Sequence, residues 1–376
     1  MRRLNVGLIG SGFIGRSHAF AWRMARTVFG LPVEPVLHTL AEVDEAAAER
    51  AAAALGFAHA SGDWQAVVRD PEIDLVDITT PNAWHEPMAM AAIAAKKPVY
   101  CEKPLAPDAA RAKAMAEAAE RAGVPTFVGF NYLKNPMVEL AAEIVRSGEV
   151  GEVWSFRGIH AEDYMTDAEN PWTWRLDPKG GAGAVADLGS HIISLARYVV
   201  GEIEAVAADL DTVVKTRPVA PGAAERKPVE VDDQARALVR FANGASGTIE
   251  ASWVATGRKL YLAFELYGSK GSILLDMERM NELALYVSGA GKGREGYRRI
   301  LASPGHKDYA PFCPAPGHQL GFNDVKTIEV KDVVTALAEG RPFYPHFREA
   351  YHVQRVVDAM LLSGRERRWV RVEEAG

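Results

Sequence analysis

The stretch VGLIGSGFIGRSHA at residues 6–19 decides the fold of the first part of the chain. Its glycines stand in G-x-G-x-x-G spacing, directly after an apolar segment of strand type and directly before a helical pattern. The first glycine permits a tight turn, the second lets the backbone approach a pyrophosphate, and the third allows the helix to pack closely on the strand. In this setting the pattern predicts a dinucleotide-binding loop. The residues expected to line it are Gly10, Gly12, Phe13, Ile14 and Gly15.

The N-terminal third of the chain alternates between strand-like and helix-like segments. We expect strands at 4–9, 33–40, 75–79, 99–101 and 126–128, and helices at 46–55, 88–95 and 108–122. Continuous apolar strands separated by helices are typical of a parallel sheet covered on both faces. Residues 1–125 are therefore predicted to form an α/β domain with a doubly wound parallel sheet.

Longer alternating segments follow in the remainder of the chain. DDQARALVRFANGASGTIEASWVA at 232–255 carries Asn243-Gly244 between two strand-like runs, which is a hairpin signal, and YLAFELYGSKGSILLD at 261–276 turns between Gly268 and Gly271. We expect residues 126–376 to form an α+β domain with a large, mainly antiparallel open sheet. The second face of such a sheet is often covered by another subunit, so a homodimer or homotetramer is expected.

Length and composition exclude several classes of protein. The chain has 376 residues, 48% of them hydrophobic, and a net charge of −6 with neither sign gathered in long runs. A nucleic-acid or membrane-surface partner is therefore not expected. No window approaches the roughly 18 apolar residues of a membrane span. With only Cys101 and Cys313 there is no disulfide framework, which suits the cytoplasm.

An acid should end the second strand, where it accepts hydrogen bonds from the adenosine ribose. Glu42 in TLAEVDEAA is the best candidate, and Asp44 is the alternative, although it can instead cap the next helix. A carboxylate here would repel a 2′-phosphate, and Val43 offers no guanidinium to bind one. The sequence therefore favours NAD over NADP.

A charged pair ends the strand-like run in PVYCEKPLAP at 98–107. Glu102 and Lys103 are costly in a buried strand unless they are paired or functional, and Pro104 stops any regular continuation. Doubly wound folds bind their ligands at the carboxyl ends of their strands, so Lys103 is a candidate functional residue.

A carboxylate and a histidine share one face of a predicted helix in GGAGAVADLGSHIISLARYVVG at 180–201. The helix is expected over 185–200, with Gly201 as its stop. Asp187 and His191 are four residues apart, so the carboxylate can orient the imidazole for acid–base work near neutral pH. The pair would equally suit a metal, but no third ligand cluster with recognisable spacing appears in the sequence, and no metal is expected.

Taken together, GLIGSGFIGRSH, DITTPNAWH, CEKPLA and the 180–201 motif strongly resemble the Gfo/Idh/MocA oxidoreductases, in the right order and over nearly the whole chain. FNYLKNP and WTWRLDPKGGAGAVADLGSHI resemble the levoglucosan dehydrogenase-like members. The resemblance implies a Rossmann domain, then an α/β domain whose open sheet mediates oligomers, with nicotinamide bound at the cleft between the domains.

The resemblance also implies roles for individual residues. Lys103 faces the substrate hydroxyl, Asp187 and His191 complete the catalytic set, and either Lys103 or His191 accepts the proton. The cofactor contacts that it implies are Thr79, Thr80, Pro81, Asn82, His85, Glu102 and Lys103. The substrate contacts that it implies, besides the catalytic set, are Asn131, Tyr132, Asp163, Tyr164, Trp174 and Arg175.

We therefore expect an NAD-dependent dehydrogenase that oxidises a secondary hydroxyl of a sugar, an anhydrosugar or a related cyclic polyol. A base with a pKa near neutrality best removes the hydroxyl proton, and a lysine ammonium stabilises the developing negative charge. An inositol dehydrogenase is the alternative within this class. A dinucleotide-binding sensor without turnover is the alternative outside it, although a sensor can lose the catalytic set and Lys103, Asp187 and His191 are all present.

Overall fold

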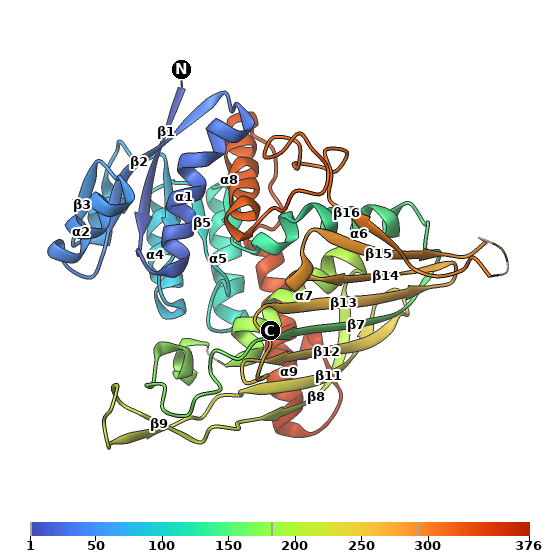
Figure 1. Cartoon of the computed structure of the whole chain (residues 1–376). Helices are drawn as coiled ribbons and strands as arrows, with labels where there is room; N and C mark the ends of the chain where they lie inside the picture. The colour runs from blue at the N-terminus through green and yellow to red at the C-terminus, as the bar shows by residue number, and fades with distance from the viewer. Residues whose placement is uncertain (1, 182, 290, 292) are drawn as a thin grey trace. The chain divides into compact units, whose positions relative to one another are not determined.

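The computed structural model describes residues 2–181, 183–289, 291 and 293–376, which form two compact units (Figure 1). The first unit consists of residues 1–134 and 321–352, and the second of residues 135–320 and 353–376. A segment from near the C-terminus thus belongs to the N-terminal unit. The sequence-based division into 1–125 and 126–376 stays a prediction about functional domains.

The first unit is built on a six-stranded parallel sheet in the order β3-β2-β1-β4-β5-β6. Its strands are β1 (Arg2–Ile9), β2 (Val33–Ala41), β3 (His59–Ser61), β4 (Leu75–Ile78), β5 (Val99–Cys101) and β6 (Thr126–Val128). Its helices are α1 (Phe13–Phe29), α2 (Glu45–Leu55), α3 (Trp64–Arg69), α4 (His85–Ala94), α5 (Ala109–Ala122) and α8 (Phe322–Glu339), with 3-10 turns η1 (Asn82–Trp84) and η2 (Asn131–Lys134). Every residue of β4 and β5 is buried, so both faces of the sheet are covered, and the predicted doubly wound parallel sheet is confirmed.

Local signals explain where several of these elements begin and end. Asp44 and Asp108 cap α2 and α5 by accepting hydrogen bonds from backbone amides of the first turn. The same helices end at Gly56 and Gly123, which adopt the left-handed conformation. The short β3 and α3 have too few residues to show a period, and the sequence analysis did not predict them.

Helix α8 completes the core of the first unit from nearly 200 residues beyond β6. Val330 and Val334 lie in one buried cluster with Leu4 and Val6 of β1 and Trp22 of α1. The sequence pattern indicates an apolar face on such a helix but not the sheet against which that face packs.

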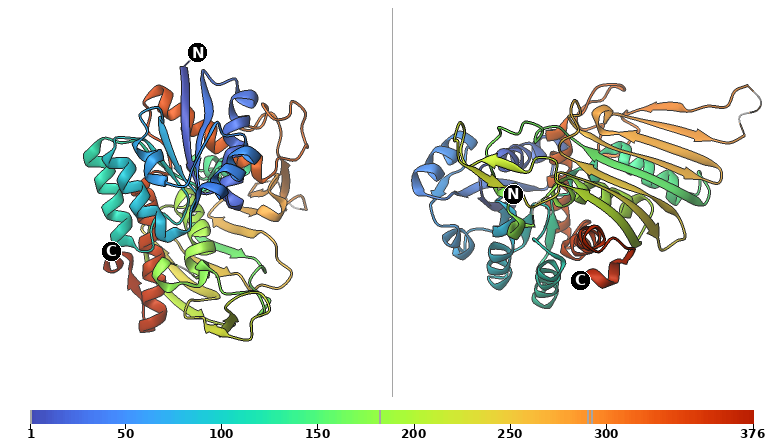
Figure 2. Two further views of the ribbon diagram at one scale, coloured as in Figure 1. Left: turned by 90° about the vertical axis from the view of Figure 1, so that its left-hand side faces the viewer. Right: turned by 90° about the horizontal axis from the view of Figure 1, so that it is seen from below.

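The second unit is built on a nine-stranded mixed sheet in the order β16-β15-β14-β13-β7-β12-β11-β8-β17 (Figures 1 and 2). Its strands are β7 (Val153–Ala161), β8 (Ile203–Asp211), β11 (Gln234–Phe241), β12 (Ser246–Ser252), β13 (Tyr261–Gly268), β14 (Gly271–Asp276), β15 (Glu282–Val287), β16 (Arg298–Leu301) and β17 (Val370–Arg371). Among the described residues of this sheet only β7 and β12 pair in parallel, and both predicted hairpins, β11–β12 and β13–β14, are present. The expectation of a large, mainly antiparallel sheet is confirmed.

Helices cover one face of this sheet. They are α6 (Pro136–Arg146), α7 (Ser190–Val199) and the second-unit part of α9 (Phe347–Glu366), with a π-helical segment η5 (Val185–Gly189) before α7. The remaining elements are the two-stranded arm β9 (Thr216–Pro218) and β10 (Arg226–Pro228), and the 3-10 turns η3 (Trp174–Leu176), η4 (Pro178–Gly180), η6 (Met277–Arg279) and η7 (Val372–Ala375). The helix predicted over 185–200 therefore begins with a π-helical turn, which an apolar stripe cannot distinguish from an α-helix.

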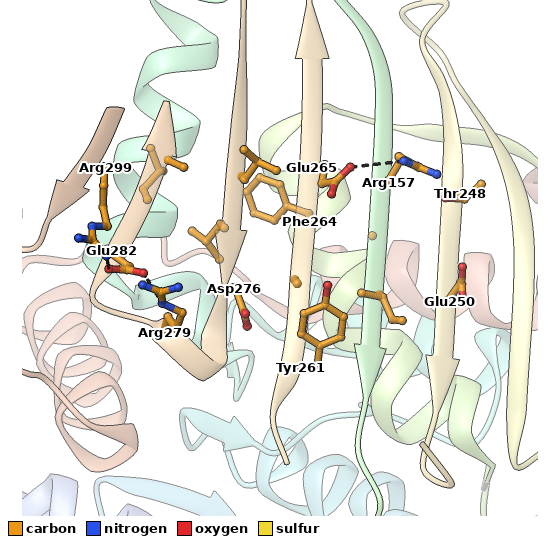
Figure 3. A pocket seen from close by; sticks show the side chains of 17 residues that line it. Arg157, Thr248, Glu250, Tyr261, Phe264, Glu265, Asp276, Arg279, Glu282 and Arg299 are labelled. Carbon is orange, nitrogen blue, oxygen red and sulfur yellow. Dashed lines mark ion pairs between the residues drawn. The ribbon is translucent and has the colours of Figure 1, made fainter. Parts of the chain in front are cut away.

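The other face of the nine-stranded sheet carries a hollow of about 610 Å³. Figure 3 shows its charged and aromatic side chains projecting from β7, β12, β13 and β14 and from the neighbouring strands. Burial alternates along β11, so one side of the strand faces the core and the other faces outward. No helix of the described residues is long and apolar enough to cross a membrane.

Candidate active site

The glycine loop of the first unit has the geometry that its spacing predicts. Gly10 follows β1 with a φ of +96°, and a Cβ on Gly15 would lie 2.2 Å from the carbonyl oxygen of Gly10, so only glycine fits there. A Cβ on Gly12 would have no neighbour within 4 Å, so the backbone is open to a ligand at this position. Phe13 begins α1 with 78% of its surface exposed, and Ile14 follows it.

Glu42 reaches this loop from the end of β2. Its Oε1 accepts hydrogen bonds from the backbone N and the Oγ of Ser11 at 2.6 and 2.7 Å, and its Oε2 accepts one from the N of Val43 at 3.1 Å. The competing candidate, Asp44, instead accepts from Ala47 N at 2.7 Å as the N-cap of α2. Of the two acids, the structure places Glu42 beside the glycine loop.

The segment 79–85 follows the end of β4, the neighbour of β1 in the sheet. The hydroxyl of Thr79 donates to the carbonyl oxygens of Ile9 and Gly10. The buried ring of His85 has Nδ1 2.8 Å from Pro104 O and Nε2 2.9 Å from Thr80 O. Burial lowers the pKa of His85, although the two carbonyl oxygens oppose this effect. The ring lies between this segment and the turn that follows Lys103. Thr80, Pro81 and Asn82 lie within the same connection.

Glu102 follows β5 and is buried. Its Oε1 lies 2.9 Å from His18 Nε2 and accepts a hydrogen bond from Lys326 Nζ at 2.9 Å, while its Oε2 accepts from Lys103 N at 3.0 Å. Burial alone would raise the pKa of Glu102, but Lys326 and His18 together lower it well below its ordinary value. Glu102 is therefore an ionised residue that orients the backbone of Lys103.

The buried charges extend behind Glu102 into a cluster that the sequence analysis did not predict as a unit. His18 Nδ1 lies 2.9 Å from Asp77, and the ammonium of Lys326 also donates to Glu329 at 2.7 Å. Tyr100 donates its hydroxyl hydrogen to Glu329 as well. Two members of the cluster lie in motifs of the sequence analysis, His18 in GLIGSGFIGRSH and Asp77 in DITTPNAWH. No sequence pattern connects Lys326 with Glu102.

In the second unit, Asp187 lies in η5 and binds the side chains of two residues that were predicted to contact the substrate. Its Oδ2 accepts hydrogen bonds from the Tyr164 hydroxyl at 2.8 Å and from Arg175 Nε at 3.1 Å. The guanidinium of Arg175 also lies over the ring of Trp174, 4.4 Å from its centroid. Burial and the charge of Asp187 raise the pKa of Tyr164 well above its usual range, so its hydroxyl stays a donor.

His191 lies in the first turn of α7, and its ring meets the edge of the His160 ring at a centroid distance of 5.4 Å. His160 Nδ1 lies 3.0 Å from Leu188 O, and its Nε2 lies 3.1 Å from Glu162. A second histidine and a second acid therefore support the helix that carries Asp187 and His191. The sequence analysis missed both, because an alternating strand such as β7 gives no sign of which helix its inner residues contact.

The other predicted substrate contacts are placed differently. Asp163 binds Lys259 Nζ at 2.6 Å and Gly257 N at 3.0 Å, so its carboxylate is already engaged in the chain. Asn131 and Tyr132 lie in the first unit, in η2. The buried Nδ2 of Asn131 has no hydrogen-bond partner among the described residues. Tyr132 contacts Phe322 at a centroid distance of 6.1 Å.

Among the residues that the structure describes, no group of three or more histidine, cysteine or acidic side chains could hold a metal ion. A parallel sheet with a glycine loop after β1 and an acid after β2, combined with a second unit that presents a carboxylate–histidine helix, defines a dinucleotide-dependent oxidoreductase.

Comparison with known proteins agrees with this class. Residues 4–130 match the model of the oxidoreductase family with an NAD-binding Rossmann fold, and residues 138–274 match the GFO/IDH/MocA C-terminal domain. The chain belongs to the Gfo/Idh/MocA oxidoreductases and is an NAD-dependent dehydrogenase. The resemblance drawn from its motifs, the enzyme class and the NAD cofactor are thereby confirmed.

Individual relatives cover most or all of the chain. Levoglucosan dehydrogenase of Pseudarthrobacter phenanthrenivorans is 38% identical, over 100% of this chain and 99% of the relative. A solved structure of levoglucosan dehydrogenase in complex with NADH and levoglucosan has a TM-score of 0.95, over 99% of this chain and 100% of that chain. Myo-inositol 2-dehydrogenase of Thermotoga maritima is 29% identical, over 77% of this chain and 80% of the relative.

Proposed function

We propose that this dehydrogenase oxidises a secondary hydroxyl of an anhydrosugar such as levoglucosan. The observation that carries the proposal is the cluster of Tyr164 and Arg175 around Asp187, with His191 one turn further along the helix. Similarity to levoglucosan dehydrogenase over the full length of the chain supports it.

The first unit fits NAD. Gly12 leaves its backbone open for a pyrophosphate, and the carboxylate of Glu42 stands beside the loop, where it suits ribose hydroxyls and repels a 2′-phosphate. Bound NAD supplies the acceptor for the hydride that leaves the substrate carbon. Thr79 and His85 shape the connections that follow β4 and β5 and so support the cofactor from the protein side.

We assign the proton of the substrate hydroxyl to His191, with Lys103 stabilising the negative charge that develops on the same oxygen. The side chain of Asp187 accepts from Tyr164 and Arg175. Its negative charge lies about one helical turn before His191, where it would favour the imidazolium that forms. Glu102 orients the backbone at Lys103. Lys103 and His191 belong to different units, and their joint action is part of the proposal.

Recognition of a sugar ring suits the side chains around this set. In the second unit, Trp174 offers an aromatic face and Arg175 offers its remaining N–H donors, while the hydroxyl oxygen of Tyr164, whose hydrogen is donated to Asp187, offers an acceptor. In the first unit, the orphan Nδ2 of Asn131 offers a further donor for a ligand oxygen. Asp163 is the weakest of the predicted contacts, because it is bound to Lys259.

A turnover assay with a panel of substrates tests the proposal. Pure protein with NAD would be offered levoglucosan, simple pyranoses and myo-inositol, and reduced nicotinamide would be recorded. We expect the highest kcat/KM with levoglucosan and no turnover by His191→Asn, which should still bind NADH. A higher kcat/KM with myo-inositol would show that the substrate is a cyclic polyol and not an anhydrosugar. Binding of NADH without turnover of any compound would instead indicate a sensor.

We further propose a homodimer or homotetramer that buries the open face of the nine-stranded sheet. Oppositely charged residues face each other across its strands, with Arg157 3.5 Å from Glu265 and Arg299 3.6 Å from Glu282 (Figure 3). An isologous contact can exchange such pairs between copies. Light scattering would show the oligomer, and Arg157→Glu should reduce its mass.

Cys101 and Cys313 are free thiols, which suit a reducing compartment. We therefore propose that the enzyme acts in the cytoplasm.

A further inference from the structure

We infer that Asp232 is a positioning residue, which holds the start of the helix that carries Asp187 and His191 and thereby sets the geometry of the catalytic set. The inference rests on the proposed roles of Asp187 and His191. Asp232 stands in the loop before β11, 45 positions beyond Asp187, and its own side chain is not placed on the substrate.

The contacts of Asp232 lie at the first turn of that helix. Its carboxylate Oδ2 accepts a hydrogen bond from Val185 N at 2.8 Å, and its backbone oxygen accepts one from Ala184 N at 2.9 Å. The first amides of a helix have no partner within the helix, and Ala184 has no side-chain acceptor with which to cap it. Asp232 therefore supplies the missing cap from a distant part of the chain.

The second carboxylate oxygen fixes the adjoining backbone. A Cβ on Gly183 would lie only 2.3 Å from Asp232 Oδ1, so the carboxylate occupies the space beside this glycine, whose φ is +107°. The N of Gly183 donates to Arg175 O at 3.3 Å, and its carbonyl oxygen accepts from Asp187 N at 3.0 Å. Gly183 is thus the point where the backbones of Arg175 and Asp187 meet.

Movement at this point would disturb the site. Arg175 and Asp187 also contact each other through their side chains, at 3.1 Å, so a shift of the first turn changes the distance between a guanidinium and its carboxylate. Catalytic groups must be held to within about 0.5 Å of their productive geometry, and a misplacement of about 1 Å can cost about a hundredfold in rate. Loss of Asp232 should therefore act on turnover rather than on cofactor binding.

The burial of the Asp232 carboxyl group favours a role in positioning the helix over a role in stabilising the fold. Asp232 is buried, its hydrogen-bond partners at the helix start are neutral amides, and Asp233 is the charged residue beside it. A buried carboxylate with neutral partners stabilises a fold poorly once it is ionised. Asp233 differs, since it accepts hydrogen bonds from Trp253 Nε1 at 2.6 Å and Val214 N at 2.7 Å and does not contact the catalytic helix in these bonds.

The test compares Asp232→Asn, Asp232→Ala and the matched control Asp233→Asn with the unchanged enzyme. The readouts are kcat, KM for NAD and for levoglucosan, the Kd of NADH and the Tm. We expect Asp232→Ala to lower kcat roughly tenfold or more while KM for NAD stays within about twofold. Asp232→Asn keeps one acceptor for Val185 N and should give an intermediate kcat. Asp233→Asn should lower the Tm and leave kcat within about twofold.

Two results would overturn the inference. One is a kcat of folded Asp232→Ala within about twofold of the unchanged enzyme. The other, decisive if Asp232→Ala does not fold, is a kcat of Asp232→Asn that equals that of the unchanged enzyme. The proposed function fails separately, because it predicts turnover by the unchanged enzyme and none by His191→Asn, whatever the Asp232 variants do.

Discussion

Arg175 Nε lies 3.1 Å from Asp187 Oδ2, across twelve positions of the chain and from a different structural element. Tyr164 donates to the same oxygen at 2.8 Å. Two donors on one oxygen restrict the rotation of the carboxylate, so the structure orients Asp187 without a substrate.

Arg175→Leu removes the guanidinium and with it the hydrogen bond from Arg175 Nε to Asp187. We expect kcat/KM for the sugar to fall roughly a hundredfold, because both a charge-assisted hydrogen bond and a proposed substrate donor are lost. The Kd of NADH, measured by nicotinamide fluorescence, should not change. Arg146→Leu is the matched control, since Arg146 also pairs with a carboxylate, that of Glu139 on α6. Its guanidinium also lies over an aromatic ring, that of Tyr198 at the opposite end of α7 from His191. Equal losses in both variants would speak against a special role of Arg175.

We predict that the choice of cofactor depends on Glu42. Replacing it by alanine and Val43 by arginine removes the carboxylate and adds a guanidinium at a position that is 88% exposed and therefore tolerant. We expect kcat/KM for NAD to fall roughly tenfold or more and that for NADP to rise. Asp44→Asn is the control, because asparagine caps α2 as well as aspartate does and should leave both values unchanged. If Asp44→Asn lowered kcat/KM for NAD more than the double variant does, Asp44 and not Glu42 would be the residue that binds the ribose.

Lys326 neutralises two buried carboxylates, those of Glu102 and Glu329. Lys326→Met should lower the free energy of unfolding by roughly 3–5 kcal/mol, because it leaves buried negative charge uncompensated. Denaturation by urea measures the loss. Lys331→Met, on the same helix, removes a less buried lysine that pairs with Asp332, and it should cost clearly less. The loss for Lys326→Met should shrink toward low pH, because removal of Lys326 raises the pKa of Glu102 and the carboxyl then takes up a proton in the variant. A loss that grows on acidification would refute this account.

The fold could be predicted from the sequence where local signals repeat. The glycine loop, the apolar strands of the first sheet and the turn at Asn243-Gly244 each depend on a few neighbouring residues, and each is present in the structure. The spacing of Asp187 and His191 likewise placed them on one helix, although its first turn is π-helical.

The candidate site could be predicted only in part, because its supports come from distant residues. Lys326 reaches Glu102 across 224 positions, and Asp232 reaches Val185 across 47. Such contacts depend on how elements pack, which no local periodicity encodes. His160 illustrates the same limit, since its burial follows from the face of β7 that the helix covers.

The free energy of unfolding should also depend on pH through the ionisation of Asp232. Burial raises its pKa from 3.8 to about 7, against the smaller opposing effect of its backbone hydrogen bonds. Between these two values the folded chain holds a proton that the unfolded chain has released, so this group's contribution to stability is complete below pH 3.8 and is lost as pH rises toward 7. Asp232→Asn cannot ionise and escapes this loss. The difference in free energy of unfolding between Asp232→Asn and the unchanged enzyme should therefore shift in favour of the variant by roughly 3 kcal/mol from about pH 4 to about pH 8. Urea denaturation at intervals across this range measures the shift, and a shift in favour of the unchanged enzyme would show that the carboxylate is stabilised in the fold by a positive charge.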